Sequence, residues 1–173
     1  MTKTHKSYSA MAVLVCGLIL VAQTLPQSPE WSQLKKEIRE TFPTVRQLTI
    51  LDFARLRQSA SEKPVILDIR EKEEYEVSHL LGARNVPPGN PVGSLELPQD
   101  RTIVCYCSVG YRSSEMAAQL QEAGYTKVYN LEGSIFEWVN TGRKVVDAQG
   151  TTKKVHGFDL EWSKLLKPEF RWL

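Results

Sequence analysis

Short apolar runs alternate with longer amphipathic stretches through the middle of the chain. The runs are rich in residues that favour β-strands and lie at 45–48, 65–67, 84–86, 103–106 and 128–131. Between them, apolar side chains recur at helical spacing. Buried runs of this kind, each followed by a helix, are typical of parallel strands covered on both faces. The pattern predicts an α/β domain with a central five-stranded parallel sheet and helices on both faces.

Two segments flank this alternating region. Upstream, Ser28 can cap a helix in which Trp31, Leu34 and Ile38 share one face. We interpret residues 25–43 as an amphipathic helical spacer that either packs on the domain or holds it away from a membrane. Downstream, residues 144–173 form a C-terminal extension. It should contain a hairpin that turns at 147–150, followed by an aromatic tail that folds back onto the domain, near the mouth of the site.

The first residues have the pattern of an export signal. Lys3, His5 and Lys6 precede an uninterrupted apolar or small run from Ala10 to Ala22, which is short for a free-standing membrane span. We predict a signal peptide or an uncleaved signal anchor at residues 1–24, and a domain exported to the periplasm or anchored outside the cytoplasm. A buried N-terminal helix is the alternative.

Composition narrows the classes of partner. The chain has 42% hydrophobic and 24% charged residues, as expected for a globular protein, and a formal net charge of +2. Lys3 and Lys6 account for that whole excess, so the rest of the chain is charge-balanced. A nucleic-acid-binding face would need a basic surface, so we expect no nucleic-acid partner. Membrane contact is expected only through the N-terminal segment.

The chemistry concentrates in one segment, residues 103–114. Cys107 lies where the apolar strand ends, and a helix begins after Gly110. Ligands bind beyond the carboxyl ends of strands in open α/β sheets. Loop N–H groups and the positive end of the helix dipole can hold an anion there, and Arg112 adds a permanent cation. Cys107 is therefore the candidate nucleophile, acting as a thiolate. Cys105 is interpreted as a core residue, with a resolving thiol as the alternative.

The loop from Cys107 to Ser113 closely resembles the active-site loop of rhodaneses, sulfurtransferases that carry sulfur as a cysteine persulfide. Two further segments are similar to the motifs of that family. One contains 65–70, Glu74, Tyr75 and 79–87, and the other runs from 124 to 138. The resemblance covers about 45–143, so we predict a rhodanese-like domain at 44–143. Ser78 and Ser134 replace glycines that are usual in the family.

This resemblance implies a three-layer fold and a persulfide on Cys107, with no other cofactor and no metal. It implies a small anionic sulfur donor such as thiosulfate, and a thiol or cyanide acceptor that could also be a protein thiol. Arg112 would either point at the donor or brace the loop. His79 is expected to be structural. Asp68 and Arg70 would support the loop, whose substrate-binding residues would be Ser108, Val109, Gly110, Tyr111, Arg112 and Ser113.

Other functions remain open at this point. A cysteine-dependent phosphatase or arsenate reductase can share the fold and the Cys…Arg loop. However, Cys107 and Arg112 enclose only four residues, whereas phosphatase loops of this kind enclose five or more. A non-catalytic binding module is the alternative from a different class, although the cysteine is present. A redox or sulfide-handling relay would use the same persulfide and cannot be separated from sulfur transfer by the sequence.

Overall fold

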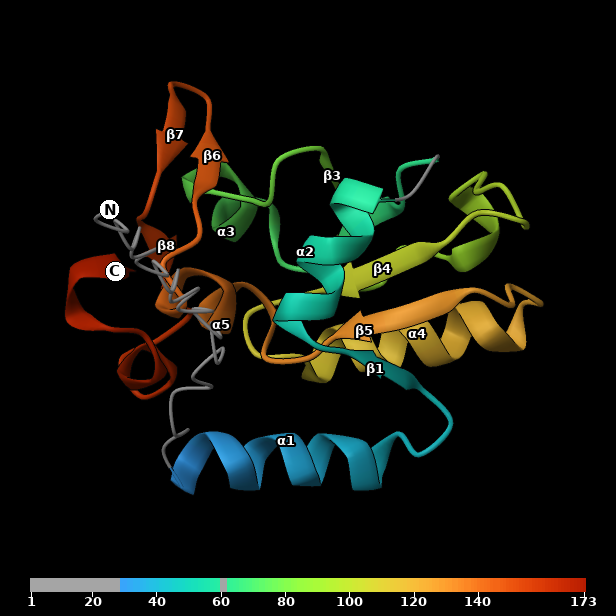
Figure 1. Cartoon of the computed structure of the whole chain (residues 1–173), viewed down its shortest axis with the longest axis horizontal. Coiled ribbons are helices and arrows are strands. Elements are labelled where there is room, and N and C mark those ends of the chain that lie inside the picture. Colours follow the sequence, from blue (N-terminus) through green and yellow to red (C-terminus); the bar gives the residue numbers. More distant parts are fainter. Residues whose placement is uncertain (1–28, 60–61) are drawn as a thin grey trace, which may run out of the picture.

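The computed structural model describes residues 29–59 and 62–173 (Figure 1). Five parallel strands form the central sheet in the order β1-β5-β4-β2-β3. Their bounds are β1 Arg46–Leu48, β2 Val65–Asp68, β3 Ala83–Asn85, β4 Ile103–Tyr106 and β5 Val128–Leu131. The central strand β4 pairs with β2 and β5 and is buried along its whole length. The predicted five-stranded parallel sheet is confirmed.

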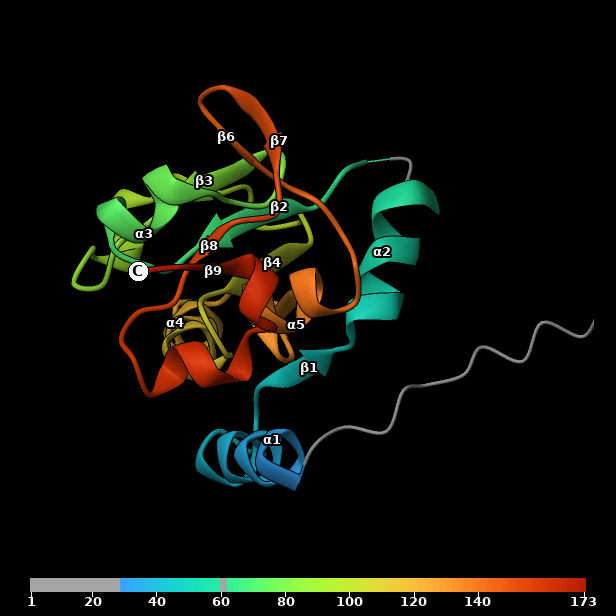
Figure 2. The same ribbon diagram turned by 90° about the vertical axis from the view of Figure 1, so that its left-hand side faces the viewer.

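Helices cover both faces of this sheet (Figure 2). Helices α2 (Ile50–Ser59) and α5 (Ser134–Asn140) pack on one face, and α4 (Tyr111–Glu122) packs on the other. Because successive side chains of a strand point to opposite faces, Val104 and Tyr106 of β4 pack toward α2 and α5. Cys105 and Cys107 pack toward α4. Each face of the sheet therefore has its own apolar core.

Helix α2 begins with a side-chain cap. Thr49 Oγ1 accepts the backbone N–H of Asp52 and donates to its carboxylate. This exchange is the capping arrangement expected at a helix start. Helix α3 (Lys72–Val77) has a capping box in which the side chains and backbone of Glu71 and Glu74 bond to each other. It connects β2 to β3.

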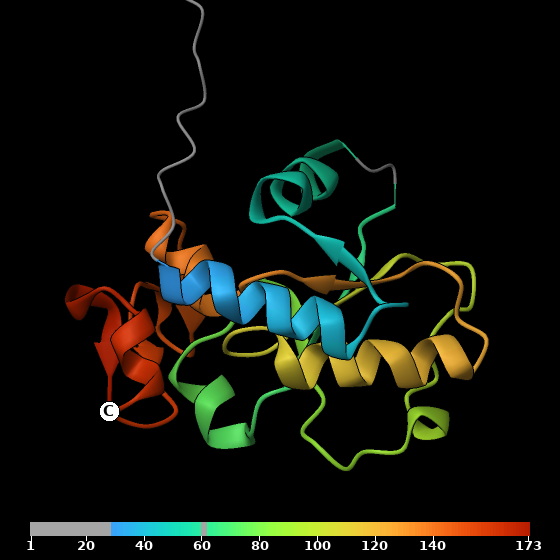
Figure 3. The same cartoon turned by 90° about the horizontal axis from the view of Figure 1, so that it is seen from below.

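Helix α1 (Pro29–Thr41) lies along the β1 side of the molecule, beside α4 and α5 (Figure 3). Trp31 and Ile38 are buried, and Lys35 forms a salt bridge with Glu137 of α5 at 2.7 Å. Of the two alternatives for the upstream segment, the structure has the helix packed on the domain. Ser28 and the predicted export segment 1–24 lie outside the described residues. Within the described part of the chain, no helix combines the length and apolarity needed to cross a membrane.

The C-terminal extension contains the predicted hairpin, built from β6 (Val145–Asp147) and β7 (Gly150–Thr152). Beyond it, β8 (Val155–His156) pairs in parallel with β9 (Arg171–Trp172). The described residues also include the short 3-10 helices η1 (Val92–Ser94), η2 (Trp162–Leu165) and η3 (Pro168–Phe170). Leu166 and Phe170 are buried in the core on the α2 and α5 face. The tail thus folds back onto the domain, as expected from its aromatic composition.

Candidate active site

Cys107 directly follows β4, and the turn after it leads into α4. Gly110 has φ +120°, a conformation that side-chain-bearing residues rarely adopt, and a Cβ there would lie 3.2 Å from Asn130 Nδ2. Its N–H donates to Cys107 Sγ at 3.2 Å. The sulfur is therefore held at the N-terminus of α4, where the helix dipole and a backbone N–H both favour negative charge.

Ser113 connects the sulfur to the neighbouring strand. Its Oγ lies 3.5 Å from Cys107 Sγ and 2.6 Å from Asn130 Oδ1, and its single proton can go to only one of them at a time. Asn130 of β5 in turn donates to Gln47 Oε1 of β1 at 2.7 Å. A chain of polar groups thus extends from the thiol across two strands. Asn130 and Gln47 are not identified by the sequence reasoning.

The first turn of α5 holds the loop from its other side. The N–H groups of Ile135 and Phe136 donate to the carbonyl oxygens of Cys107 and Ser108 at 3.2 and 3.1 Å. The Cys107 N–H donates to Ser134 Oγ at 3.1 Å, and Ser134 Oγ donates to the Leu131 carbonyl. Ser134 replaces the second glycine of the family pattern and keeps a glycine-like φ of +49°. Its hydroxyl adds a hydrogen bond that a glycine could not supply.

Arg112 is hydrogen-bonded to α3, the arrangement expected of an arginine that braces the loop. Its guanidinium forms two hydrogen bonds with the Glu74 carboxylate of α3, at 2.8 and 2.9 Å. Ser108 Oγ donates to the same carboxylate at 2.9 Å and accepts from Arg112 at 3.1 Å. Glu74 is buried, and sequence reasoning did not assign it to the site. The only sequence signal is its place within the family motif, since its charged neighbours are typical of a solvated helix.

Burial and pairing act in opposite directions on the pKa values of Glu74 and Arg112. Burial alone would raise the pKa of Glu74, but the hydrogen bonds and charge of Arg112, with the charge of Arg70, lower it overall. Burial alone would lower the pKa of Arg112, but Glu74 and the nearby Cys107 sulfur raise it. Both groups are therefore charged at neutral pH, and the carboxylate neutralises the only arginine of the loop.

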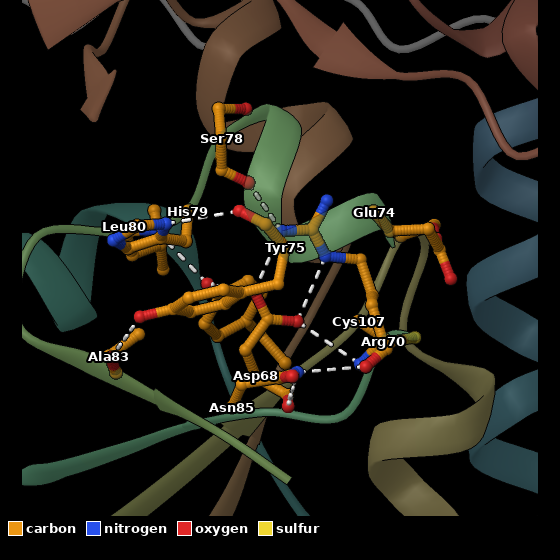
Figure 4. A network of polar contacts seen from close by, with 12 residues as sticks. Asp68, Arg70, Glu74, Tyr75, Ser78, His79, Leu80, Ala83, Asn85 and Cys107 are labelled. Atoms are coloured by element: carbon orange, nitrogen blue, oxygen red, sulfur yellow. Dashed lines mark hydrogen bonds and ion pairs between the residues drawn. The ribbon is translucent and has the colours of Figure 1, made fainter. Parts of the chain in front are cut away.

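Asp68 and Arg70 form a fully buried ion pair beneath the loop (Figure 4). Arg70 Nε and Nη2 donate to the two Asp68 carboxylate oxygens at 2.9 and 2.7 Å, and Nη2 also donates to the Ser78 carbonyl. Tyr106, which directly precedes Cys107, donates its hydroxyl proton to Asp68. The ion pair thus reaches the loop through the end of β4. Ser78 has φ −175°, which any residue can adopt, so the missing glycine causes no strain.

Two groups of this buried network have strongly shifted pKa values. Burial raises the pKa of Tyr106 well above its ordinary value, and the Asp68 charge adds to that effect. Burial would lower the pKa of Arg70, but the Asp68 carboxylate raises it overall. These groups keep one protonation state at physiological pH, which suits a structural support. His79 is stacked on the Tyr75 ring at 3.9 Å and its backbone pairs with Val146, so its contacts here are structural.

The remaining candidate residues lie around the same loop. Val109 is buried, and Tyr111 is 50% exposed and packs edge-on at 5.2 Å against Phe42, which directly follows α1. Cys105 is fully buried in β4, and burial raises the pKa of its thiol. Within the described residues, no group of three or more His, Cys, Asp or Glu side chains is placed to hold a metal ion.

Comparisons with known proteins agree on the fold and the family. The family model of the rhodanese-like domain matches residues 52–141. A sulfurtransferase of Allochromatium vinosum is 34% identical over 95 residues, covering 54% of this chain and 89% of that protein. The probable adenylyltransferase/sulfurtransferase MoeZ of Mycobacterium tuberculosis is 35% identical over 82 residues, covering 46% of this chain and 21% of that protein. The chain thus matches about a fifth of that relative's length.

A solved structure shows the same fold. The thiosulfate sulfurtransferase of Pseudomonas aeruginosa superposes with a TM-score of 0.57 at 19% identity, over 78% of this chain and 26% of that chain. The family match at 52–141 includes the Cys107 loop, Asp68, Arg70 and Glu74, but neither α1 nor the C-terminal extension.

Proposed function

Because the chain belongs to the rhodanese-like domain family, we propose that it is a sulfurtransferase that carries a sulfane sulfur as a persulfide on Cys107. The placement of Cys107 Sγ at the start of α4, with the Gly110 N–H 3.2 Å away, carries this proposal. The same N–H group and helix dipole would stabilise the negative charge of a persulfide and of the transition state that forms it.

The reaction has two displacement steps. Cys107 thiolate attacks the outer sulfur of a donor such as thiosulfate, so that a new S–S bond forms and the S–SO₃ bond breaks. Sulfite leaves with the electron pair. An acceptor thiolate or cyanide then attacks the outer sulfur of the persulfide, and Cys107 thiolate is the leaving group. This scheme gives ping-pong kinetics and needs no resident metal or other cofactor.

The surrounding residues have separate roles in this proposal. The loop from Ser108 to Ser113 forms the substrate-binding cradle, in which Arg112 acts with Glu74 to fix the loop. Asp68 and Arg70 support the cradle through Tyr106. Tyr111, which is half-exposed, lines the entrance. On the pattern of residues 1–24 we propose that the domain acts outside the cytoplasm, in the periplasm or at a membrane, with no nucleic-acid partner.

Intact-mass spectrometry of the full chain tests the proposal. After incubation with thiosulfate and removal of the reagent, we expect the native protein to gain one sulfur atom. The Cys107→Ser variant should gain none, and cyanide should remove the added mass. Cys105→Ser is the matched control, and it should still gain the sulfur because its thiol is buried away from the loop. Hydrolysis of an aryl phosphate without a sulfur adduct would instead favour the phosphatase alternative.

A further inference from the structure

A side chain from outside the family-matched segment covers the arginine of the active-site loop. The Phe158 ring, in the C-terminal extension, lies over the Arg112 guanidinium, 5.2 Å from the ring centroid. Glu74 binds the edge of the same guanidinium through the two terminal nitrogens, Nη1 and Nη2. Arg112 therefore has its edge paired with a carboxylate and its face occupied by an aromatic ring.

The extension holds Phe158 in place by specific contacts. Phe158 has φ +68°, which a phenylalanine rarely adopts, so the backbone around it must compensate the strain. Its N–H donates to His156 Nδ1 at 3.0 Å, and the His156 ring packs against Trp172 at 5.3 Å. The Gly157 N–H donates to the Trp172 carbonyl at 2.9 Å. The β8–β9 pair thus fixes the turn that presents Phe158 to Arg112.

This arrangement changes what the mouth of the site can recognise. A small dianionic donor would gain most from a free guanidinium edge, but Glu74 already binds that edge and neutralises its charge. The Phe158 ring over Arg112 is 49% exposed, so it remains available to a substrate. Such rings favour contact with an apolar organic group over contact with a hydrated anion.

We propose that Phe158 is a specificity-determining residue of the Cys107 site, which disfavours small dianionic sulfur donors and favours sulfur exchange with uncharged organic thiols. This inference rests on the proposed sulfur transfer. In the favoured step, the thiolate of the organic molecule attacks the outer sulfur of the Cys107 persulfide and a new S–S bond forms. The bond between that sulfur and Cys107 Sγ breaks, and Cys107 leaves as a thiolate. The organic group flanking the thiol packs on Phe158.

Two rate ratios measured on the full chain test this proposal. The first is kcat/KM of each variant for thiosulfate, with cyanide as acceptor, divided by that of the native protein. The second compares the discharge of sulfur-loaded protein to two capped tripeptides, in which the cysteine lies between two leucines or between two serines. The variants are Phe158→Ala and Phe158→Leu, with Leu160→Ala as matched control, since Leu160 belongs to the same segment and is 71% exposed. Urea unfolding of each variant verifies that it is folded.

We expect the native protein to prefer the leucine peptide by about tenfold, the effect of burying one small apolar contact. Phe158→Ala should lose this preference, while Phe158→Leu should retain it. Loss of the ring from the guanidinium should raise kcat/KM for thiosulfate about two- to fivefold in Phe158→Ala, the size of an exposed cation–π interaction. Leu160→Ala should match the native protein in both ratios.

Sulfur uptake on Cys107 with both ratios unchanged in Phe158→Ala would overturn the role of Phe158 and leave sulfur transfer standing. The same would follow if Leu160→Ala produced an equal change. If Cys107 of the native protein took up no sulfur at all, the proposed function would fail, and the inference about Phe158 would fail with it.

Discussion

The carboxylate of Glu74 binds both Ser108, next to the nucleophile, and Arg112, in the first turn of α4. One buried charge thus connects α3 to the two ends of the active-site turn. Such a group stabilises the loop only while it is ionised, because a neutral carboxyl group forms a weaker bond with a guanidinium. The rigidity of the turn at Cys107 should therefore depend on pH through Glu74.

Glu74→Gln tests this dependence. At neutral pH the substitution should lower the free energy of unfolding by about 1–3 kcal/mol, because Arg112 loses its charged partner in a largely buried site. The pKa of Glu74 is lowered by folding, so its contribution is present above the ordinary glutamate pKa of about 4.3 and is lost as the pH falls through the lowered value. The difference between native protein and variant should therefore shrink in that acidic range.

Urea unfolding at neutral pH and at a series of pH values below 5 measures this difference. Glu73→Gln is the matched control because Glu73 belongs to the same helix and is exposed, so it should change stability by less than about 0.5 kcal/mol. An equal loss in the two variants, or a difference that stays constant down to the acid transition, would contradict the assigned role of Glu74.

The sequence identifies some residues of this site and misses others for a physical reason. Cys107, Gly110 and Arg112 are found because a buried strand, a turn and a helix start are local patterns. Glu74 and Ser134 are not assigned to the site, because their partners are selected by how α3 and α5 pack against the loop. Asp68 and Arg70 are found through the resemblance, but their link through Tyr106 depends on the sheet register.

At the scale of elements, α1 and α5 together support the turn at Cys107. The first turn of α5 donates two N–H groups to loop carbonyls, and Ile38 of α1 lies where a Cβ on Gly110 would contact it. Lys35 of α1 bonds to Glu137 of α5 and lies 3.9 Å from Glu132. The position of α1 against the loop therefore depends on a salt bridge in which the lysine side chain is only 8% exposed.

Lys35→Ala should consequently destabilise the fold by about 1–3 kcal/mol, because two largely buried carboxylates lose a cation. Lys36→Ala is the matched control. Lys36 lies one residue further along α1 and pairs with Glu40 in solvent, where such pairs contribute about 0–1 kcal/mol. Urea unfolding of both variants gives the comparison, and equal stabilities would show that the α1–α5 salt bridge does not hold the helix in place.

The helical spacing of Trp31, Leu34 and Ile38 predicts the face of α1 that packs. This spacing cannot decide whether the helix packs on the domain or holds the domain away from a membrane, because an amphipathic face is compatible with either. Lys35 illustrates the reason. From the sequence, a lysine is expected to face solvent, and its burial is favourable here only because acidic residues of the α5 region lie opposite it. The strands of the sheet and the helices that cover it are better predicted, since the spacing of their apolar residues depends on burial alone.

At the scale of the whole molecule, the family-matched segment shares its core with the C-terminal extension. Leu166 and Phe170 pack in the same apolar cluster as Trp138 and Val139 of α5. Asn140 Nδ2 donates to the Leu165 carbonyl, and its Oδ1 accepts the Lys167 N–H. The extension is therefore bonded to the end of α5, whose first turn holds the Cys107 loop. We expect the extension and the sheet to unfold together.

Leu166→Ala tests whether the extension and the sheet unfold together. Leu166 is almost fully buried, so the substitution should destabilise the protein by about 2–5 kcal/mol through lost burial and the cavity that it leaves. Leu160→Ala in the same extension should change stability little, because Leu160 is exposed. Tryptophan fluorescence, which includes Trp162 and Trp172 of the tail, and far-ultraviolet circular dichroism should report one coincident urea transition in every variant. Separate transitions, or a Leu166→Ala effect confined to the fluorescence signal, would mean that the extension folds independently. Phe158 could then leave Arg112 without any loss of the sheet.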